Sequence, residues 1–298
     1  MLMKKRTTVA MMIAIGACVL MSSSANAAVI GLEDFDGGAI NLSSTSNVFD
    51  FGAGGGSTGD VFGRVSPGFA GGTGAPFDVA DDSVGVGGTG YSGAPAFPDD
   101  TLGIAGNNTS AFFAMNDMDG STAPDPVLSD ATWTFDITSA QSIDNIQIDL
   151  AAMGDFEASS SDGFSIWARV DANPYQQIFL ASTDEDAFKE YRPLDGGFVF
   201  MDDDPLELFI DGAAVSVGFL DKSVAATGQF DTYTSTLLAG SVGSTLDVQV
   251  QWIGTPSGSE PMGIDNITIN GTPIPEPATI MLLAAAGLGV VGLRFRLK

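Results

Sequence analysis

Residues 246–252 read Leu-Asp-Val-Gln-Val-Gln-Trp, an unbroken alternation of apolar and polar side chains. Successive side chains of a β-strand point to opposite faces, so this stretch predicts a strand with one buried face and one polar face. Residues 146–150, Ile-Gln-Ile-Asp-Leu, repeat the pattern. Strands of this kind are typical of antiparallel sheets that cover a core on one side and meet water on the other.

Strand-like runs with Gly, Asp and Ser between them fill the rest of the middle of the chain. Apart from 246–252, we expect strands at 131–137, 143–152, 163–170, 176–181, 197–201, 213–219, 230–238 and 263–269. Packing two sheets face to face is the natural way to bury so many half-apolar strands. The sequence therefore predicts an all-β protein, an antiparallel β-sandwich over residues 28–270 with glycine-rich loops.

Residues 52–110 form a glycine-rich insertion in this predicted domain. Runs such as Gly85-Val-Gly-Gly-Thr-Gly90 carry far more glycine than the remainder of the chain. Two interpretations stay open, long ordered loops over the sandwich or a partly disordered insertion. No Lys-Ser/Thr follows these runs and no strand-to-helix pattern surrounds them, so they are not phosphate-binding loops.

The composition excludes several classes of function. The 298-residue chain has a formal charge of −26 and contains no histidine, and its one cysteine is Cys18. Of its 37 acidic residues all but Glu276 lie in residues 28–275, against five basic ones, which gives this segment a charge of −31. Such a body repels phosphate backbones, so nucleic acid is not a partner. Catalytic triads with histidine and zinc sites of the usual kind are excluded as well.

Residues 1–27 have the layout of a secretory signal peptide. Lys4, Lys5 and Arg6 precede an apolar run at 9–21, and Ala25-Asn26-Ala27 offers a small-x-small cleavage site. We expect export and a mature chain that begins near Ala28. An uncleaved membrane helix and lipid attachment at Cys18 are the alternatives.

The C-terminus has the features of a membrane anchor. A proline-rich spacer at 271–277 leads into 16 uncharged residues, 278–293, and the chain closes with Arg294, Arg296 and Lys298. As a helix the apolar run spans about 24 Å, somewhat less than the hydrocarbon core of a bilayer. The three positive charges stop the helix on the cytoplasmic side, so the body lies outside the inner membrane.

Pro275-Glu276-Pro277, the short apolar helix and the basic end together resemble the PEP-CTERM sorting tail of Gram-negative bacteria. The resemblance covers residues 271–298 and implies that an exosortase, a membrane-embedded transpeptidase-like enzyme, recognises Pro275, Glu276 and Pro277. It further implies an intermediate tethered transiently to the inner membrane through 278–293. After removal of the tail, the protein would reach the cell envelope, the outer surface or an extracellular exopolysaccharide matrix. The alternative is an ordinary tail anchor behind a proline-rich linker.

A second resemblance concerns the two ends of the body. Gly263-Ile-Asp-Asn-Ile-Thr-Ile269 is similar to the final strand of jelly-roll domains related to carbohydrate-binding modules. This resemblance implies a structural Ca²⁺ held by Glu33, or its neighbour Asp34, and by Asp265, with Glu260 as a further ligand. Calcium prefers six to eight oxygen ligands and would fasten the first strand to the last. In the alternative interpretation, Asp265 and Asn266 only shape a strand edge.

Two functions remain compatible with these features. The leading hypothesis is a non-catalytic structural or adhesive envelope protein that binds glycans and has no catalytic residues. The alternative is a glycoside hydrolase or lyase that works through two carboxylates, a chemistry that needs no histidine. Trp133, Trp167 and Trp252 are candidates for stacking on sugar rings, but each falls within an expected strand, and we expect all three to pack in the core.

Overall fold

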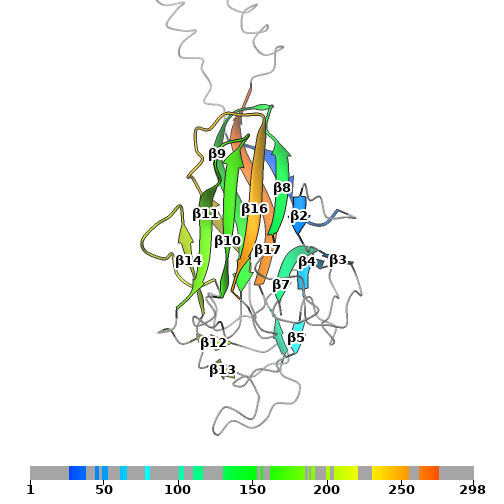
Figure 1. The fold of residues 1–298 in the computed structure, drawn as a ribbon, viewed down its shortest axis with the longest axis vertical. Coiled ribbons are helices and arrows are strands. Elements are labelled where there is room, and N and C mark those ends of the chain that lie inside the picture. The colour runs from blue at the N-terminus through cyan, green and yellow to red at the C-terminus, as the bar shows by residue number, and fades with distance from the viewer. Residues whose placement is uncertain are drawn as a thin grey trace, which may run out of the picture.

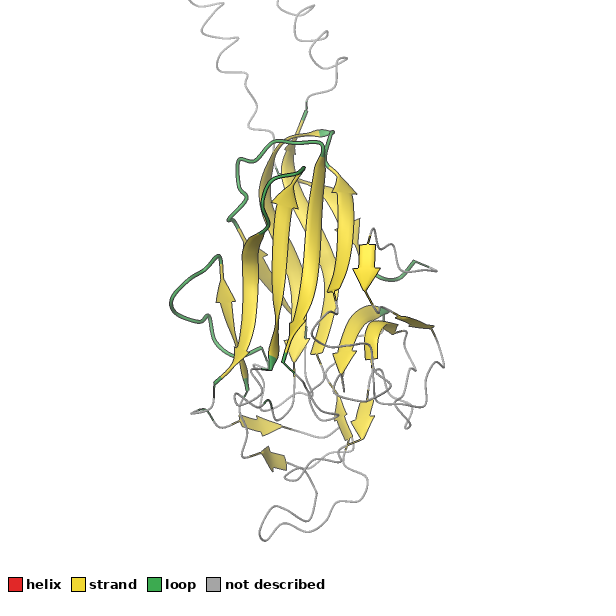
Figure 2. Ribbon diagram, viewed as in Figure 1, coloured by secondary structure: helices red, strands yellow, loops and turns green. Residues whose placement is uncertain are grey.

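The computed structural model describes residues 27–37, 44–46, 49–52, 61–65, 78–80, 101–103, 110–116, 130–152, 156, 162–184, 187, 189–191, 199–201, 205–220, 230–254 and 262–274. Every regular element in these residues is a β-strand (Figure 2). Two large sheets stack on each other as a sandwich, which confirms the predicted all-β class (Figure 1).

The alternating stretch at 246–252 lies at the centre of a six-stranded sheet, as strand β16. Its neighbours β10 and β8 pair with it antiparallel over their whole lengths, and this register places Leu246, Val248 and Val250 on the same face as the buried apolar residues of both neighbours. In order across the sheet the strands are β14 (Leu206–Ile210), β11 (Gln176–Thr183), β10 (Gly163–Val170), β16 (Thr245–Ile253), β8 (Asp130–Asp136) and β2 (Ser44–Ser46).

A seven-stranded sheet forms the second layer, and its central strand is β17. One edge of β17 pairs with β9, while the other edge pairs with β7 in its first part and with β1 in its second. The strands are β15 (Asp231–Ser235), β9 (Ala140–Ala152), β17 (Met262–Pro273), β7 (Phe112–Asn116), β4 (Val61–Val65), β3 (Phe49–Gly52) and, beside β17, β1 (Ala28–Glu33). All its pairs are antiparallel except β3 with β4, which the sequence did not indicate.

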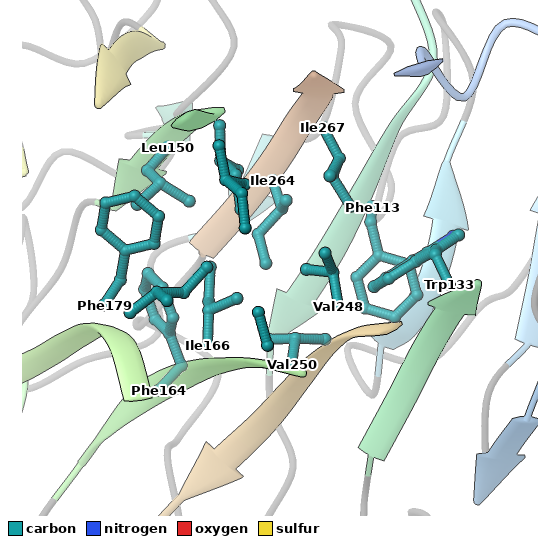
Figure 3. Packing of buried hydrophobic residues seen from close by; sticks show 14 of the residues in the cluster. Phe113, Trp133, Leu150, Phe164, Ile166, Phe179, Val248, Val250, Ile264 and Ile267 are labelled. Carbon is teal, nitrogen blue, oxygen red and sulfur yellow. The ribbon is translucent and has the colours of Figure 1, made fainter. Parts of the chain in front are cut away.

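The core fills the space between the two sheets. Phe164 and Ile166 of β10, Val248 and Val250 of β16, and Ile264 of β17 all point into it (Figure 3). Burying a large apolar side chain contributes about 1.5–3 kcal/mol, so this interior is the main source of stability.

Aromatic rings dominate one part of the core. The Trp133 ring meets Phe35 edge-on at 5.6 Å and Phe113 at 5.2 Å between ring centroids, and Phe62 meets Phe113 at 5.1 Å. Edge-to-face pairs of this kind add about 0.5–1.5 kcal/mol beyond the area they bury. They join the turn after β1 to strands β4, β7 and β8.

The structure corrects the expected strand at 213–219. That segment is a loop, and the strand lies just before it as β14, where Leu206 and Leu208 are buried. The Val217 N–H still donates to Leu208 at 2.8 Å, but Gly218 adopts a φ of +113°, which a continuing strand does not allow. The alternation of Val215 and Val217 therefore belongs to an exposed loop.

Two small two-stranded antiparallel sheets complete the described elements, β12 (Lys189–Tyr191) with β13 (Val199–Met201) and β5 (Asp78–Ala80) with β6 (Thr101–Gly103). Among the residues described, no helix is long and apolar enough to cross a membrane. The expected signal peptide, apart from Ala27, and the expected tail helix at 278–293 lie outside the described residues.

Candidate functional site

The outer face of the six-stranded sheet carries an aromatic and polar surface, which we call the Trp167 face. In β10 every second side chain, from Phe164 to Val170, points inward to the core. The residues between them, Ser165, Trp167 and Arg169, therefore point outward. Across the sheet Trp167 lies opposite Gln249 on one side and Gln177 on the other. The half-buried Trp167 ring therefore has amide side chains along both of its flanks.

Hydrogen bonds fix the polar side chains of this face. The Trp167 indole N–H donates to Ser165 Oγ at 2.8 Å. The Gln251 amide donates to Gln249 at 2.9 Å, and the Gln249 amide donates to Asp130 at 3.0 Å. The side chains are thus held in place before any ligand arrives, and binding a ligand would order few of them anew.

An ion pair and a tyrosine ring lie next to Trp167 on this face, at the paired positions Arg169 and Asp247. Arg169 contacts Asp247 Oδ2 at 2.8 Å, and Thr134 donates to the other Asp247 oxygen at 2.6 Å. The Arg169 guanidinium lies 4.3 Å from the centre of the Tyr175 ring, a cation–π contact.

Tyr175 reaches across the sheet from the turn between β10 and β11. Its hydroxyl hydrogen-bonds with Thr132 on β8. Burial and the nearby charge of Asp247 raise the pKa of Tyr175, and the hydrogen bond with Asp247 raises the pKa of Arg169. At neutral pH the phenol is therefore protonated and the guanidinium is charged. Thr132 and Asp247 are buried although they point outward.

The three tryptophans do not share one environment. Trp133 and Trp252 are buried in the core, which confirms the expectation for these two. The expectation of core packing was wrong for Trp167, which lies on the outer face. The sequence did hold the signal, because the alternation in 163–170 places Trp167 in phase with Ser165 and Arg169. The sequence did not indicate which residues would lie beside Trp167. Strand register brings Gln249 and Asp247 to this face, and the turn between β10 and β11 brings Tyr175.

The predicted calcium ligands Glu33 and Asp265 are both buried at the junction of β1, β7 and β17. Glu33 accepts the Phe35 N–H at 2.9 Å, and Asp265 accepts the Asn266 N–H at 2.8 Å. Ser110 donates to Asp265 at 3.5 Å. Glu260 lies outside the described residues, and among those that are described no three acidic side chains group as metal ligands.

Arg64 of β4 brings a positive charge to the same junction, which we call the Arg64 junction. Its guanidinium is largely buried and donates to the carbonyl oxygens of Phe35 at 3.1 Å and Gly37 at 2.7 Å. No pattern in the sequence indicated that one of the five basic residues of the body would lie here.

Asp265 and Asn266 also lie at an irregularity of the strand. Asn266 adopts a φ of +49°, and the register of β17 against β9 shifts between Asp265 and Thr268. The Asn266 amide donates to Asp149 on β9 at 2.9 Å. This bulge re-aims the side chains of β17 next to the Arg64 junction.

The C-terminal end of the body stays paired up to the expected sorting signal. Pro273 lies opposite Ala140, and the Ile274 N–H donates to the Ser139 carbonyl at 2.9 Å. The sorting residues Pro275, Glu276 and Pro277 and the basic residues Arg294, Arg296 and Lys298 lie outside the described residues.

Comparison with known families identifies one motif. Residues 273–298 match the PEP-CTERM protein-sorting motif. This motif is the recognition signal of exosortases, and it implies export and membrane-anchored processing towards the cell surface.

Other comparisons are weaker. Comparison with curated proteins gives no match. Among solved structures, the chain is similar to the binding domain of botulinum neurotoxin serotype G, at 10% identity and a TM-score of 0.24. The alignment covers 69% of this chain and 51% of that one, so the chain spans about half the length of that structure.

Proposed function

We propose that this exported, exosortase-sorted protein is a non-catalytic adhesive module of the cell envelope or exopolysaccharide matrix, and that it binds glycans on the Trp167 face. The observation that carries the proposal is the Trp167 ring between Gln177 and Gln249, with an ordered network of hydroxyls and amides around it. A jelly-roll body like that of carbohydrate-binding modules is the finer form of the same proposal.

Sugar rings suit this surface for physical reasons. The faces of a pyranose ring expose C–H groups, which stack on the flat apolar face of an aromatic ring. The hydroxyls at the ring edge need partners that both donate and accept. The Gln251 amide can do both, whereas the two amide hydrogens of Gln249 already donate to Asp130 and Thr132, so Gln249 offers only its oxygen. The residues stand on rigid strands and not on a loop, so the surface suits repeated units of a polymer.

The charges favour neutral glycans over acidic ones. The positive charge of Arg169 on this face is already paired with Asp247, so it is not available to bind an acidic sugar. The body as a whole carries a charge of −31, so uronate or sulfate groups would be repelled. A neutral polysaccharide meets no such repulsion.

Affinity gel electrophoresis tests this proposal. The full chain, purified in detergent, should migrate more slowly in gels that contain a neutral glucan or mannan than in gels without polymer. Gels that contain alginate serve as the acidic comparison and should cause no retardation. Equal migration in all gels would contradict glycan binding.

The competing hydrolase function makes a different demand. A glycosidase needs two carboxyl groups about 5–10 Å apart on either side of the scissile bond. On the Trp167 face Asp130 is bonded to Gln249, and Asp247 is bonded to Arg169 and Thr134. We therefore expect no release of reducing ends from any polysaccharide that the protein binds; steady release would favour the enzyme.

The sorting function is tested at Glu276. In a host that contains an exosortase, Glu276→Gln keeps the size of the side chain but removes the charge of the recognition tripeptide. We expect tail removal, followed on gels as the loss of residues beyond the tripeptide, to slow at least about tenfold, as for loss of a central recognition group. Arg296→Lys, which keeps the charge of the basic end, is the control. Processing of Glu276→Gln at the normal rate would contradict this role of the tripeptide.

Calcium at Glu33 and Asp265 stays a prediction that chelation can test. An ion that binds only the folded state stabilises it. At free Ca²⁺ of 100 to 1,000 times its Kd, removing the ion should lower the free energy of unfolding by about 3–4 kcal/mol, and the melting temperature with it. The measurement is thermal unfolding with EDTA, compared with EDTA plus excess Ca²⁺. Identical unfolding curves under the two conditions would contradict the calcium prediction, and the positive charge of this junction would then come from Arg64.

A further inference from the structure

The body ends without a linker before its sorting signal. The sheet fixes the backbone through Ile274, whose N–H donates to Ser139. The recognition tripeptide begins at the next residue, Pro275, and the apolar run begins at Ala278. From Ile274 to Ala278 there are four peptide units, which span at most about 14 Å.

An enzyme that acts on the tripeptide beside the membrane must therefore lie against the end of the sandwich from which the tail leaves. We call this end the tail pole. It consists of the start of β1 at Ala28, Ile274, and the connections 137–139, 171–174 and 236–244.

Pairing and hydrogen bonds bring these parts together. Ala28 lies opposite Gly271 near the end of β17. The Ile137 N–H donates to Ser244 at 3.0 Å, which joins two of the connections. The Asp171 carboxylate accepts the Ser244 N–H at 2.9 Å, which joins the third. Figure 2 shows the loops gathered at the upper end of the sandwich, where β17 also ends.

Several large apolar side chains at the tail pole are exposed to solvent. Val29, Val242 and Ile274 are exposed, and Val242 shows 68% of its surface to solvent. Beside Val242 lies a hollow of about 450 Å³, which Val170 and Leu238 also line. Exposed apolar groups next to a hollow are typical of surfaces that contact another protein.

The charged side chains in and next to the three connections have one sign. Residues 136–139, 171–174 and 236–244 contain no lysine or arginine. A hydrogen bond from the Thr138 hydroxyl lowers the pKa of Asp136, and the Thr245 and Ser244 N–H groups lower the pKa of Asp171. Both carboxylates are therefore charged at neutral pH. An acidic rim is repelled by anionic lipid headgroups and attracted by a basic protein surface.

We propose that the tail pole is a docking surface for the sorting enzyme, and that Val242 and Ile274 contact an apolar patch with a basic rim on that enzyme. This inference rests on the proposed sorting by an exosortase and adds a second contact outside the tripeptide. The enzyme recognises the folded end of the body together with the sorting signal. An enzyme bound to the tripeptide contacts the tail pole at the same time, because only a few residues separate the two.

Substitution of Val242 tests this contact in the full chain, expressed in a host that contains an exosortase. Val242→Asp places a charge in the apolar contact, and we expect tail removal to slow about fivefold or more, as for loss of an interface anchor. The matched control is Val215→Asp, because Val215 is also exposed, at 77%, but lies on the loop after β14. Melting curves of both variants show whether the body remains folded.

Two further variants separate the possible causes. A Gly/Ser linker of about twelve residues after Ile274 adds roughly 20 Å of reach and frees the enzyme from the tail pole. In that chain Val242→Asp and wild type should be processed at the same rate. Val242→Lys should also slow processing of the chain without a linker, because it too places a charge in the apolar contact.

The outcomes distinguish this inference from the sorting function itself. Faster processing of Val242→Lys would mean that the pole meets anionic lipid and would overturn docking on the enzyme. Equal processing of Val242→Asp, Val215→Asp and wild type would overturn the docking surface while sorting stands. If the wild-type tail is never removed, the proposed sorting function fails first.

Discussion

Replacement of Trp167 by alanine is expected to weaken binding of neutral polysaccharide by about 30-fold or more, the loss typical of a central aromatic contact. The ring is the flat apolar element of the Trp167 face, and its indole N–H is already held by Ser165. Removing it takes away the stacking surface but leaves the amide network of Gln249 in place. The measurement is the retardation of the variant in affinity gels over a range of polymer concentrations.

Two control variants give this result its meaning. Trp167→Phe keeps an aromatic face and should retain part of the affinity, because stacking does not need the indole N–H. Gln147→Ala changes a polar residue of β9, on the outer face of the opposite sheet, and should bind as wild type does. Full affinity of Trp167→Ala, in a variant with a normal melting curve, would exclude this face as the glycan site.

Replacement of Arg64 by methionine is expected to lower the free energy of unfolding by about 3 kcal/mol or more. The guanidinium is the donor to the carbonyls of Phe35 and Gly37, and it brings positive charge to a junction that contains buried Glu33 and Asp265. Methionine fills a similar volume without donors or charge. Urea unfolding at neutral pH measures the change.

Arg169→Met is the matched control for this prediction. Arg169 also pairs with a carboxylate, but 35% of its side chain is exposed, and pairs near the surface contribute less than about 1 kcal/mol. We therefore expect a clear difference between the two variants. An Arg64→Met protein as stable as wild type would show that the Arg64 junction needs no internal cation.

The large strands could be predicted because their sequences alternate without interruption. Residues 163–170, 143–152 and 246–252 became β10, β9 and β16 within three residues of the expected bounds. At 213–219 the same rule gave the wrong answer, because two exposed valines alternate in a loop that Gly218 ends. An alternating pattern indicates which side chains of a strand would lie on the same face. It does not indicate whether that face is buried by another part of the protein.

The candidate sites depended on pairing that the sequence does not specify. Glu33 and Asp265 were placed together through a resemblance, and both lie buried at one junction. Arg64 reaches that junction from β4, a strand inside the glycine-rich segment, where no periodic pattern indicated one. Tyr175 reaches the Trp167 face from a turn, and such a reach is fixed by tertiary structure and not by spacing along the chain.

The absence of a linker before the sorting signal also emerged only from the structure. In the sequence, residues 271–277 read as a proline-rich spacer between body and anchor. In the structure β17 continues through Pro273, so part of the spacer is a strand of the sandwich. Proline is tolerated there because the pairing of β17 with β9 is irregular between Thr272 and Pro273.

The central claim is that the Trp167 face binds neutral glycans, and the indole N–H signals of the three tryptophans test it most directly. Titration of the ¹⁵N-labelled, tail-processed protein with a neutral oligosaccharide should shift the Trp167 signal and leave those of the buried Trp133 and Trp252 in place. The same titration with an oligouronate should shift none of them. A Trp167 signal that does not move with any neutral glycan that the protein retains would contradict the account.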